Sequence, residues 1–395
     1  MTGALDGIRV IDFGQYIAGP LAAVMLADQG AEVIHVDPPG GPRWKNAADA
    51  FYNRGKLRIT LDLKDPNDHA VAARLIDAAD VVIENFRPGV MRRLGFEPPN
   101  TGRLIWCSIP GFASDDPRAT IPAWEGVVAA ATDTYLPLGQ IRPPLPGEDP
   151  DQPVYTALPL ASNFAAFHAA TAIVMALLAR EHSGQGQRIE VPMFDAMFEL
   201  IGANGIMLNG VYPIARGQGS RTFVGQDGRH LLFNSTSTPR FRRAFARASG
   251  DQTPSPEVFA TRPANEWETT INSAGGPSTM VRSPAEWLRN DHARTRGVVV
   301  EVDDPELGPT WMPGVQVHLS DSPGAIQPRH LPDADRDVVS NLPQPSGSAS
   351  TLKDRESALG GLRVLDFTQV VAGPCTGRIL VEYGADVIKI NNPQP

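Results

Sequence analysis

The sequence has little cysteine and no long apolar run. Its two cysteines, Cys107 and Cys375, lie far apart and predict neither a disulfide framework nor a metal site. No stretch approaches the roughly 18 uninterrupted apolar residues of a membrane span. The first residues lack the basic start and apolar segment of a secretory signal. We therefore expect a cytoplasmic protein with reduced thiols and no membrane partner.

Positive charge is also scarce. The 395 residues contain 35 Lys and Arg against 44 Asp and Glu, a net charge of −9, and an acidic field argues against nucleic acids and membrane surfaces as partners. Residues 43–103 differ, with 11 basic against 8 acidic side chains. This local excess is either an ordinary solvated surface or a groove for the phosphates of a nucleotide or coenzyme, and composition alone favours neither.

Glycine and proline are abundant, with 37 residues of each. They show no three-residue period, which excludes collagen and indicates many turns between short elements. An apolar fraction of 42% excludes disorder along the whole chain. The length predicts two or three domains, or one large domain with a second one inserted.

An internal repeat links the two ends of the chain. Residues 5–39 align without a gap with residues 359–393, and 16 of the 35 positions are identical. We interpret this as a tandem duplication, in which residues 358–395 are the truncated start of a second copy. Residues 343–357 have the composition of a flexible linker. The second copy is too short to cover both faces of a parallel sheet by itself.

The repeated unit predicts a strand, a helix and a second strand. In the first copy the strands cover residues 8–13 and 32–36, and the helix has Pro20 at its first position, reaches about Gln29 and is capped by Gly30. The Gly-x-Gly-x-x-Gly turn that cradles dinucleotide phosphates is absent. A nicotinamide or flavin cofactor is therefore not expected.

Strands and helices continue to alternate after this unit. The patterns predict strands at 57–63, 81–83, 104–108 and 188–191, and helices at 69–79, 87–94 and 163–180. This alternation is typical of an α/β domain with a parallel sheet covered on both faces. We expect a large domain from residues 1–214, a smaller α+β domain at 215–300, and a return segment at 301–342.

Several motifs resemble the class III coenzyme A transferases, which include formyl-CoA transferase, carnitine-CoA transferase and α-methylacyl-CoA racemase. The most specific are Asn53-Arg-Gly-Lys56 and Glu84-Asn-Phe-Arg-Pro-Gly89. The resemblance extends in order from residue 5 to about residue 340. It implies a Rossmann-like parallel sheet domain, a small domain and an interlocked dimer.

The resemblance also implies a binding site for coenzyme A, which is a substrate and not a permanently bound cofactor. No metal is implied. From the residues alone, Asn85 would be read as a helix cap and Phe86 as a core residue. The positions that match the coenzyme contacts of the family are Ile17, Ala18, Leu63, Lys64, Asn85, Phe86 and Arg93.

The chain departs from the family at its central residue, an aspartate that attacks the acyl-CoA thioester. The matching position holds Ser162, or Asn163 after a shift of one residue, and neither is a carboxylate. His168 lies too far around a helix from Ser162 to serve as its base. Asp195 is the nearest carboxylate downstream, at a position that is usually structural.

Other departures agree with a lost activity. The glycine-rich loop of the family has no counterpart in residues 132–142. Pro38, Pro110 and Pro122 stand where relatives often carry Arg or Lys, and Trp124 stands at the histidine of the racemases.

Two hypotheses follow. The chain either transfers CoA between an acyl-CoA and a small carboxylic acid, or it is a catalytically silent half that supplies the dimer partner of an active second copy. The partner copy would come from a homodimer or from pairing within a longer chain. An acyl-CoA racemase is disfavoured by Trp124, and the sequence does not name the acyl group.

Overall fold

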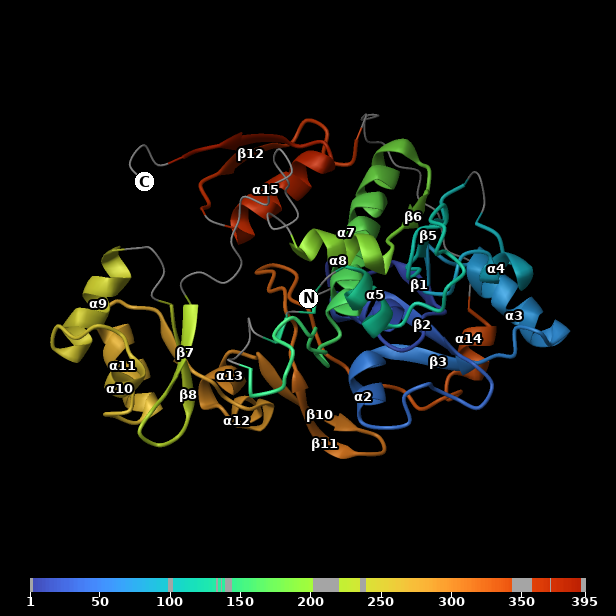
Figure 1. Ribbon diagram of the computed structural model, residues 1–395. Helices are drawn as coiled ribbons and strands as arrows, with labels where there is room; N and C mark the ends of the chain where they lie inside the picture. The colour runs from blue at the N-terminus through green and yellow to red at the C-terminus, as the bar shows by residue number, and fades with distance from the viewer. Residues whose placement is uncertain are drawn as a thin grey trace. The chain divides into compact units, whose positions relative to one another are not determined.

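A computed structural model describes residues 3–98, 102–132, 134–135, 137–138, 144–201, 220–234, 239–342, 357–369 and 371–391 (Figure 1). The chain separates into two compact units, residues 1–201 with 300–395 and residues 202–299. The domain boundary expected at 214/215 and most of the linker expected at 343–357 lie outside the described residues.

The first unit is built on a six-stranded parallel sheet. Its strand order is β3-β2-β1-β4-β5-β6, which is the order of doubly wound parallel sheets. The expected α/β class with a parallel sheet is thus confirmed. The strands are β1 (Arg9–Asp12), β2 (Glu32–Asp37), β3 (Lys56–Thr60), β4 (Val81–Glu84), β5 (Ile105–Ser108) and β6 (Arg188–Glu190).

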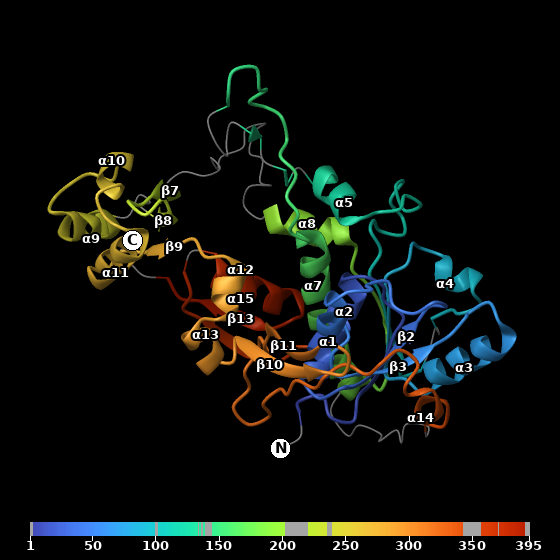
Figure 2. The same ribbon diagram turned by 90° about the horizontal axis from the view of Figure 1, so that it is seen from below.

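Helices cover both faces of this sheet. One face packs against α1, α5, α7 and α8, and the other against α3, α4 and α14; Figure 2 shows the two groups on opposite sides of the strands. The helices of this unit are α1 (Ala18–Asp28), α2 (Ala48–Tyr52), α3 (Pro66–Asp77), α4 (Val90–Arg93), α5 (Glu125–Ala131), α7 (Leu160–Ser183), α8 (Met193–Ile201) and α14 (Arg336–Ser340).

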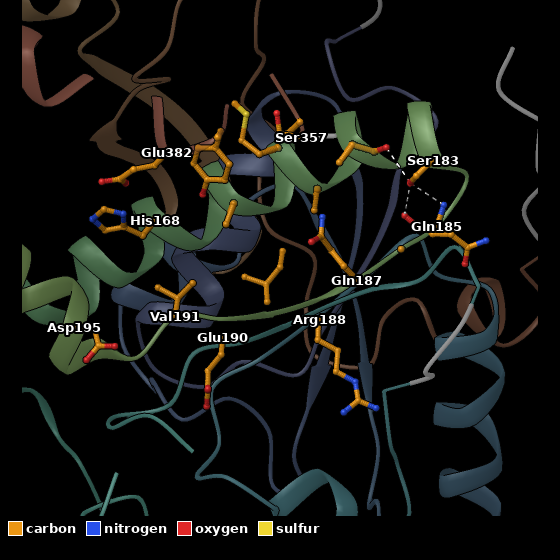
Figure 3. A pocket seen from close by; sticks show the side chains of 18 of the residues that line it. His168, Ser183, Gln185, Gln187, Arg188, Glu190, Val191, Asp195, Ser357 and Glu382 are labelled. Atoms are coloured by element: carbon orange, nitrogen blue, oxygen red, sulfur yellow. Dashed lines mark hydrogen bonds between the residues drawn. The ribbon is translucent and has the colours of Figure 1, made fainter. Parts of the chain in front are cut away.

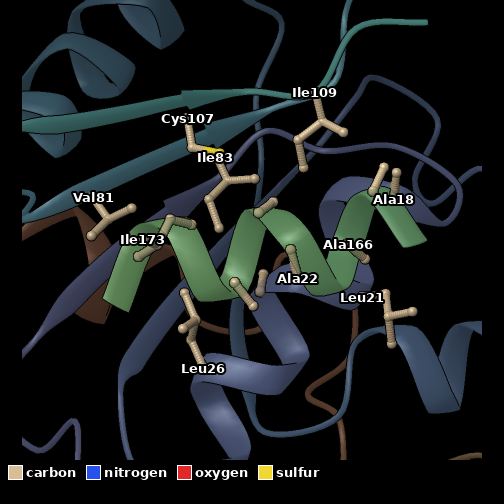
Figure 4. Close-up of a cluster of buried hydrophobic side chains, with 14 of the residues drawn as sticks. Ala18, Leu21, Ala22, Leu26, Val81, Ile83, Cys107, Ile109, Ala166 and Ile173 are labelled. Atoms are coloured by element: carbon tan, nitrogen blue, oxygen red, sulfur yellow. The ribbon is translucent and has the colours of Figure 1, made fainter. Parts of the chain in front are cut away.

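The apolar strands divide their side chains between the two faces. In β1, Val10 belongs to the cluster under α1 and α7, whereas Ile11 belongs to the cluster under α3 and α4. Successive strand residues point to opposite faces, so a strand covered on both sides is apolar throughout. Figure 4 shows Ala22 of α1 and Ala166 of α7 close together on the side of the sheet that Ile83 faces, where small side chains allow the two helices to pack closely.

All four expected helix starts in this unit are displaced: α3 begins at Pro66 and not at residue 69, and α7 begins at Leu160 and not at residue 163. The other two displacements have a physical reason. α1 begins at Ala18, so Pro20 is its third residue and not its first; proline is tolerated there because none of the first helical N–H groups has an intrahelical partner. The helix expected at 87–94 is only α4, because Gly89 before it has a φ of 79° and interrupts the helical backbone. The strand expected at 57–63 ends at Thr60.

A buried ion network holds the edge of the sheet. Lys56 donates to Asp12 at 2.8 Å, and Arg58 donates to Asp37 at 2.8 Å. Burial by itself would raise the pKa of Asp12, but Lys56 and His35 outweigh it and lower that pKa to about 2. Charges taken out of water are tolerated only when paired in this way.

The network changes the interpretation of the basic segment at 43–103. Its Arg54, Lys56 and Arg58 are buried and paired with carboxylates of the same chain. They are therefore neither solvated nor free to bind a phosphate. The Asn53-Arg-Gly-Lys56 motif serves the fold in this structure.

The second unit has its own core. Its described residues form an antiparallel sheet in the order β7-β8-β9, with Phe233, Phe245, Phe259 and Trp267 buried. Its elements are β7 (Ser220–Val224), β8 (His230–Asn234), β9 (Ser278–Met280), α9 (Pro239–Ser249), α10 (Pro256–Phe259), α11 (Ala264–Ser273), α12 (Pro284–Leu288) and α13 (Asp291–Thr295).

The chain then forms a small sheet of β10 (Val299–Asp304) and β11 (Gly308–Pro313) before a second β-α-β unit. This unit consists of β12 (Arg363–Asp366), α15 (Ala372–Glu382) and β13 (Asp386–Lys389). Arg363 of β12 lies opposite Asp386 of β13, just as Arg9 of β1 lies opposite Glu32 of β2. The strand register of the first β-α-β unit therefore recurs in the second.

The two β-α-β units differ in how far their apolar side chains are exposed. In β12 Leu365 is 56% exposed and Phe367, just after it, is 65% exposed, whereas the matching Ile11 and Phe13 are 0% and 1% exposed. The apolar face that α3, α4 and α14 cover in the first β-α-β unit is thus exposed in the described part of the second β-α-β unit.

Candidate functional site

The candidate site lies where β1 and β4 end, side by side in the sheet. The chain leaves β1 toward β2 on one side, and β4 lies on the other. Such a switch point is where ligands bind in open parallel sheets, just outside the carboxyl ends of the strands. Two cavities of about 520 and 370 Å³ lie here, and they share the lining residues Gln15, Arg43 and Phe86. We call the pair the groove.

The loop after β1 forms one wall of the groove. Asp12 accepts a hydrogen bond from the N–H of Gly14 at 2.8 Å. Gly14 and Gly19 approach so closely that a Cβ on Gly19 would lie 2.7 Å from the Cα of Gly14. Ile17 and Ala18 follow at the start of α1, and both line the larger cavity.

The Asn85 side chain joins this loop to the end of β4. Its oxygen accepts from the N–H of Gln15 at 2.7 Å, and its nitrogen donates to the carbonyl of Gln15 at 2.8 Å. Asn85 is therefore not a cap for the following helix, and the helix-cap reading is wrong. Next to it, Phe86 lines both cavities, and its N–H donates to Glu84 at 2.8 Å.

The smaller cavity contains the residues expected near adenine and phosphate. Leu63 and Lys64 line it, together with Pro38 after β2. Arg93 is exposed on α4 and lines neither cavity. Arg43 lines both cavities and was not predicted as a site residue, since it follows the glycines after β2 in no regular pattern.

Ser162 lies in the larger cavity, near the start of α7. Its hydroxyl donates to a carboxylate oxygen of Glu125 at 2.7 Å, and its N–H donates to the same oxygen at 3.0 Å. The amide of Asn163 donates instead to the carbonyl of Pro159 at 2.6 Å, and Asn163 does not line the cavity. Of the two positions considered, Ser162 is the one in the groove.

Sequence reasoning missed Glu125. It is the first residue of α5 and stands 37 residues before Ser162, so no helical or strand spacing connects the two. The one available signal was its neighbour Trp124, which matches the racemase histidine.

Aromatic side chains line the same cavity. The Trp124 ring lies 4.8 Å from the ring of Tyr16, edge to face, and is 58% exposed. Trp44 donates from its indole nitrogen to the carbonyl of Tyr16 at 3.0 Å. Tyr16 has a φ of 64°, an uncommon left-handed conformation for a residue with a side chain, and such conformations cluster at functional sites.

Pro122 lines the larger cavity, whereas Pro110 does not. The segment expected to lack the glycine-rich loop, residues 132–142, falls for the most part outside the described residues, including Gly139.

A separate cavity of about 750 Å³ contains His168 and Asp195 (Figure 3). Burial, followed by Arg378, lowers the pKa of His168, whereas burial and then Asp116 raise the pKa of Asp195. Neither residue lines the groove, and His168 does not meet Ser162, as the helical spacing predicted.

Among the residues that the structure describes, no group of three or more His, Cys, Asp or Glu side chains could hold a metal ion. By length and composition α7 is apolar enough to cross a membrane, but half of its most apolar part is buried inside the protein, as in the core helix of a globular domain.

Comparison with known proteins identifies the family. The model of CoA-transferase family III matches residues 5–257, 234–338 and 359–395, so the end of the chain matches separately from the rest. The chain belongs to CoA-transferase family III. The resemblance found in the sequence is thereby confirmed.

Two curated relatives are named as CoA-transferases. The chain is 30% identical to the CoA-transferase/lyase DddD of Marinomonas sp. (strain MWYL1), an alignment that covers 99% of this chain and 56% of that protein. It is 29% identical to the acetyl-CoA:oxalate CoA-transferase of Acetobacter aceti, covering 84% of this chain and 92% of the relative. The chain thus spans little more than half of the first relative and most of the second.

The fold of this family III chain also matches a solved structure. The Rv3272 protein of Mycobacterium tuberculosis superposes with a TM-score of 0.72 at 25% identity, over 86% of this chain and 99% of that one.

Proposed function

We propose that the groove binds coenzyme A and its acyl thioesters, and that the chain belongs to a system that transfers CoA between an acyl-CoA and a small carboxylic acid. Membership of CoA-transferase family III supports the reaction class. The position of the groove at the carboxyl ends of β1, β2 and β4 supports the binding site.

The residues proposed to contact the coenzyme lie in two groups. Ile17, Ala18 and Asn85 line the larger cavity, whereas Leu63 and Lys64 line the smaller one. Phe86 and Arg43 line both. The cations Arg43 and Lys64 suit phosphate groups, since a charged donor strengthens a hydrogen bond to an anion.

The proposal includes a degenerate site in this copy. Ser162 occupies the expected place of the aspartate, and its hydroxyl, although it donates to the Glu125 carboxylate, does not form the acid anhydride that a carboxylate forms with an acyl group. This single observation favours the second candidate function, a silent half that pairs with an active copy. The second β-α-β unit, with its repeated register, supports the tandem arrangement behind that candidate. Trp124 disfavours a racemase, because an indole is not an acid or base that could exchange the proton on the α-carbon of a substrate.

Calorimetric titration with CoA tests the binding proposal. We expect binding that weakens with salt and weakens further in Lys64→Ala. Lys45→Ala is the matched control, because Lys45 is exposed nearby but lines neither cavity. Absence of heat with millimolar CoA, confirmed by equilibrium dialysis, would overturn the proposal.

A further inference from the structure

Charge is divided unevenly between the two compact units of the chain. Residues 202–299 contain 12 Arg, no Lys and 7 Asp or Glu, a net charge of +5. The remaining residues contain 23 Lys and Arg against 37 Asp and Glu, a net charge of −14. The overall charge of −9 therefore combines a basic unit with a strongly acidic one. Surfaces of opposite charge attract each other and can set how two proteins associate.

The basic charge of the second unit is concentrated on α9. This helix buries Phe245 and Ala248 in the core of the unit. Its other side is exposed and carries four arginines and no acidic residue: Arg240, Arg242, Arg243 and Arg247. We call these four residues the arginine face. In the described part of the second unit, ion pairs form at Arg229, Arg262 and Arg282, but none forms at the arginine face.

The arginine face is unfavourable for a helix without a partner. Arg243 and Arg247 are four residues apart, and like charges at this spacing repel. Arg240 and Arg242 lie in the first turn, at the positive end of the helix dipole, where acidic side chains are favoured. A surface that only faces water usually mixes both signs of charge. An anionic partner would remove both unfavourable effects.

The partner that fits this face best is a protein surface rich in carboxylates. The planar guanidinium group binds a carboxylate or a phosphate with two parallel hydrogen bonds. Nucleic acids and membranes are extended arrays of phosphates, and the attached unit of charge −14 repels them. The apolar side of α9 is buried in its own core, so the helix does not insert into a bilayer.

The acidic unit of this chain offers such carboxylates on the loop at residues 144–155, between α5 and α7. Asp149 and Asp151 are exposed there, and no Lys or Arg occurs from residue 143 to residue 179. Neither aspartate forms an ion pair with a described residue. Figure 2 shows the loop reaching past α5 and α8. Pro146, Pro150 and Pro153 restrict its backbone, so little freedom is lost when it binds.

From this complementarity we propose that the arginine face of one copy of the chain binds Asp149 and Asp151 of a second copy. Two residues of extended chain span at most about 7 Å, and Arg243 and Arg247 are about 6 Å apart along the helix. Each aspartate can therefore meet one arginine. In a two-fold dimer the contact occurs twice. The arginine face does not line the groove, so the contact is independent of CoA binding.

Sedimentation velocity of the full chain at low and high salt tests the proposal. We expect a dimer that dissociates as salt screens the charges. Arg243→Glu combined with Arg247→Glu should weaken self-association roughly tenfold or more. Arg289→Glu, at an exposed position outside α9, is the matched control and should leave it unchanged. A monomer at low salt would overturn the proposal. So would a dimer that does not respond to salt, which would point to the exposed Leu365 and Phe367 instead.

An exchange of charges between two chains gives the sharper test. One chain carries Arg243→Glu and Arg247→Glu, and the other carries Asp149→Arg and Asp151→Arg. Each chain alone brings like charges together at the contact and should be monomeric. Their mixture pairs opposite charges at both contacts and should form a heterodimer.

A mixture that stays monomeric would overturn the proposal. Binding of duplex DNA or of phosphatidylserine vesicles by the unmodified chain, lost in the arginine variant without any self-association, would also overturn it in favour of a phosphate-bearing partner. Thermal unfolding of each variant shows that a change in association does not come from a lost fold.

Discussion

Asn85 is the residue on which the shape of the groove depends most directly. Its amide makes a pair of hydrogen bonds with the backbone of Gln15 and so fixes the loop after β1 to the end of β4. These two segments are the walls between which we expect the coenzyme to lie.

We predict that Asn85→Ala lowers the free energy of unfolding by about 1–3 kcal/mol, because two backbone groups lose their partner. CoA binding should weaken as the loop moves. Denaturant titration and calorimetry measure the two effects, and Asn67→Ala, which alters an exposed amide on α3, is the control. Wild-type affinity in Asn85→Ala would contradict this role.

The buried Asp12 gives stability a defined dependence on acid. Folding lowers the pKa of Asp12 from 3.8 to about 2. The ionised Asp12 therefore contributes stability that is fully present above pH 3.8 and is lost as the pH falls through about 2. His35→Gln removes one of the two charges responsible and should move this loss to higher pH. Unfolding free energies measured from pH 6 to pH 2 test the shift, and parallel curves for both proteins would refute it.

At the scale of elements, the contact of α1 with α7 depends on alanine. Ala22, Ala166 and Ala169 are fully buried where these helices pack. We predict that Ala166→Leu costs about 1–3 kcal/mol, because a well-packed core has no room for the added methylenes. Urea unfolding measures the cost. Thr171→Leu, at an exposed position of α7, should change stability by less than about 0.5 kcal/mol.

The elements show what the sequence could and could not predict. Apolar runs such as Val81–Glu84 identified the strands, because a strand buried on both faces has no other pattern. Helix starts were less certain, since Pro20 is acceptable at any of the first positions of α1. The site was predicted where its residues follow strands directly, as Asn85 does. Glu125 was not, because tertiary packing alone brings α5 to the start of α7.

At the scale of the whole molecule, the groove and the second β-α-β unit are separate features. Every residue that lines the groove comes from positions 13–193. We therefore predict that a chain ending at residue 342 keeps its affinity for CoA and its thermal unfolding temperature. Calorimetric titration with CoA measures the affinity, and scanning calorimetry measures the unfolding temperature, for both the shortened and the full chain. A large loss of either would show that the second unit supports the first.

The second β-α-β unit has a further consequence for the behaviour of the protein at high concentration. β1 pairs on both sides, with β2 and β4, but its counterpart β12 pairs with β13 alone in the described part of the chain. Within the described residues the short sheet therefore has two unpaired edges, as well as the exposed Leu365 and Phe367. Open strand edges beside apolar side chains are templates for aggregation. Concentrated samples of this chain should self-associate through β12 and β13, and charged substitutions at Leu365 and Phe367 should keep them monodisperse.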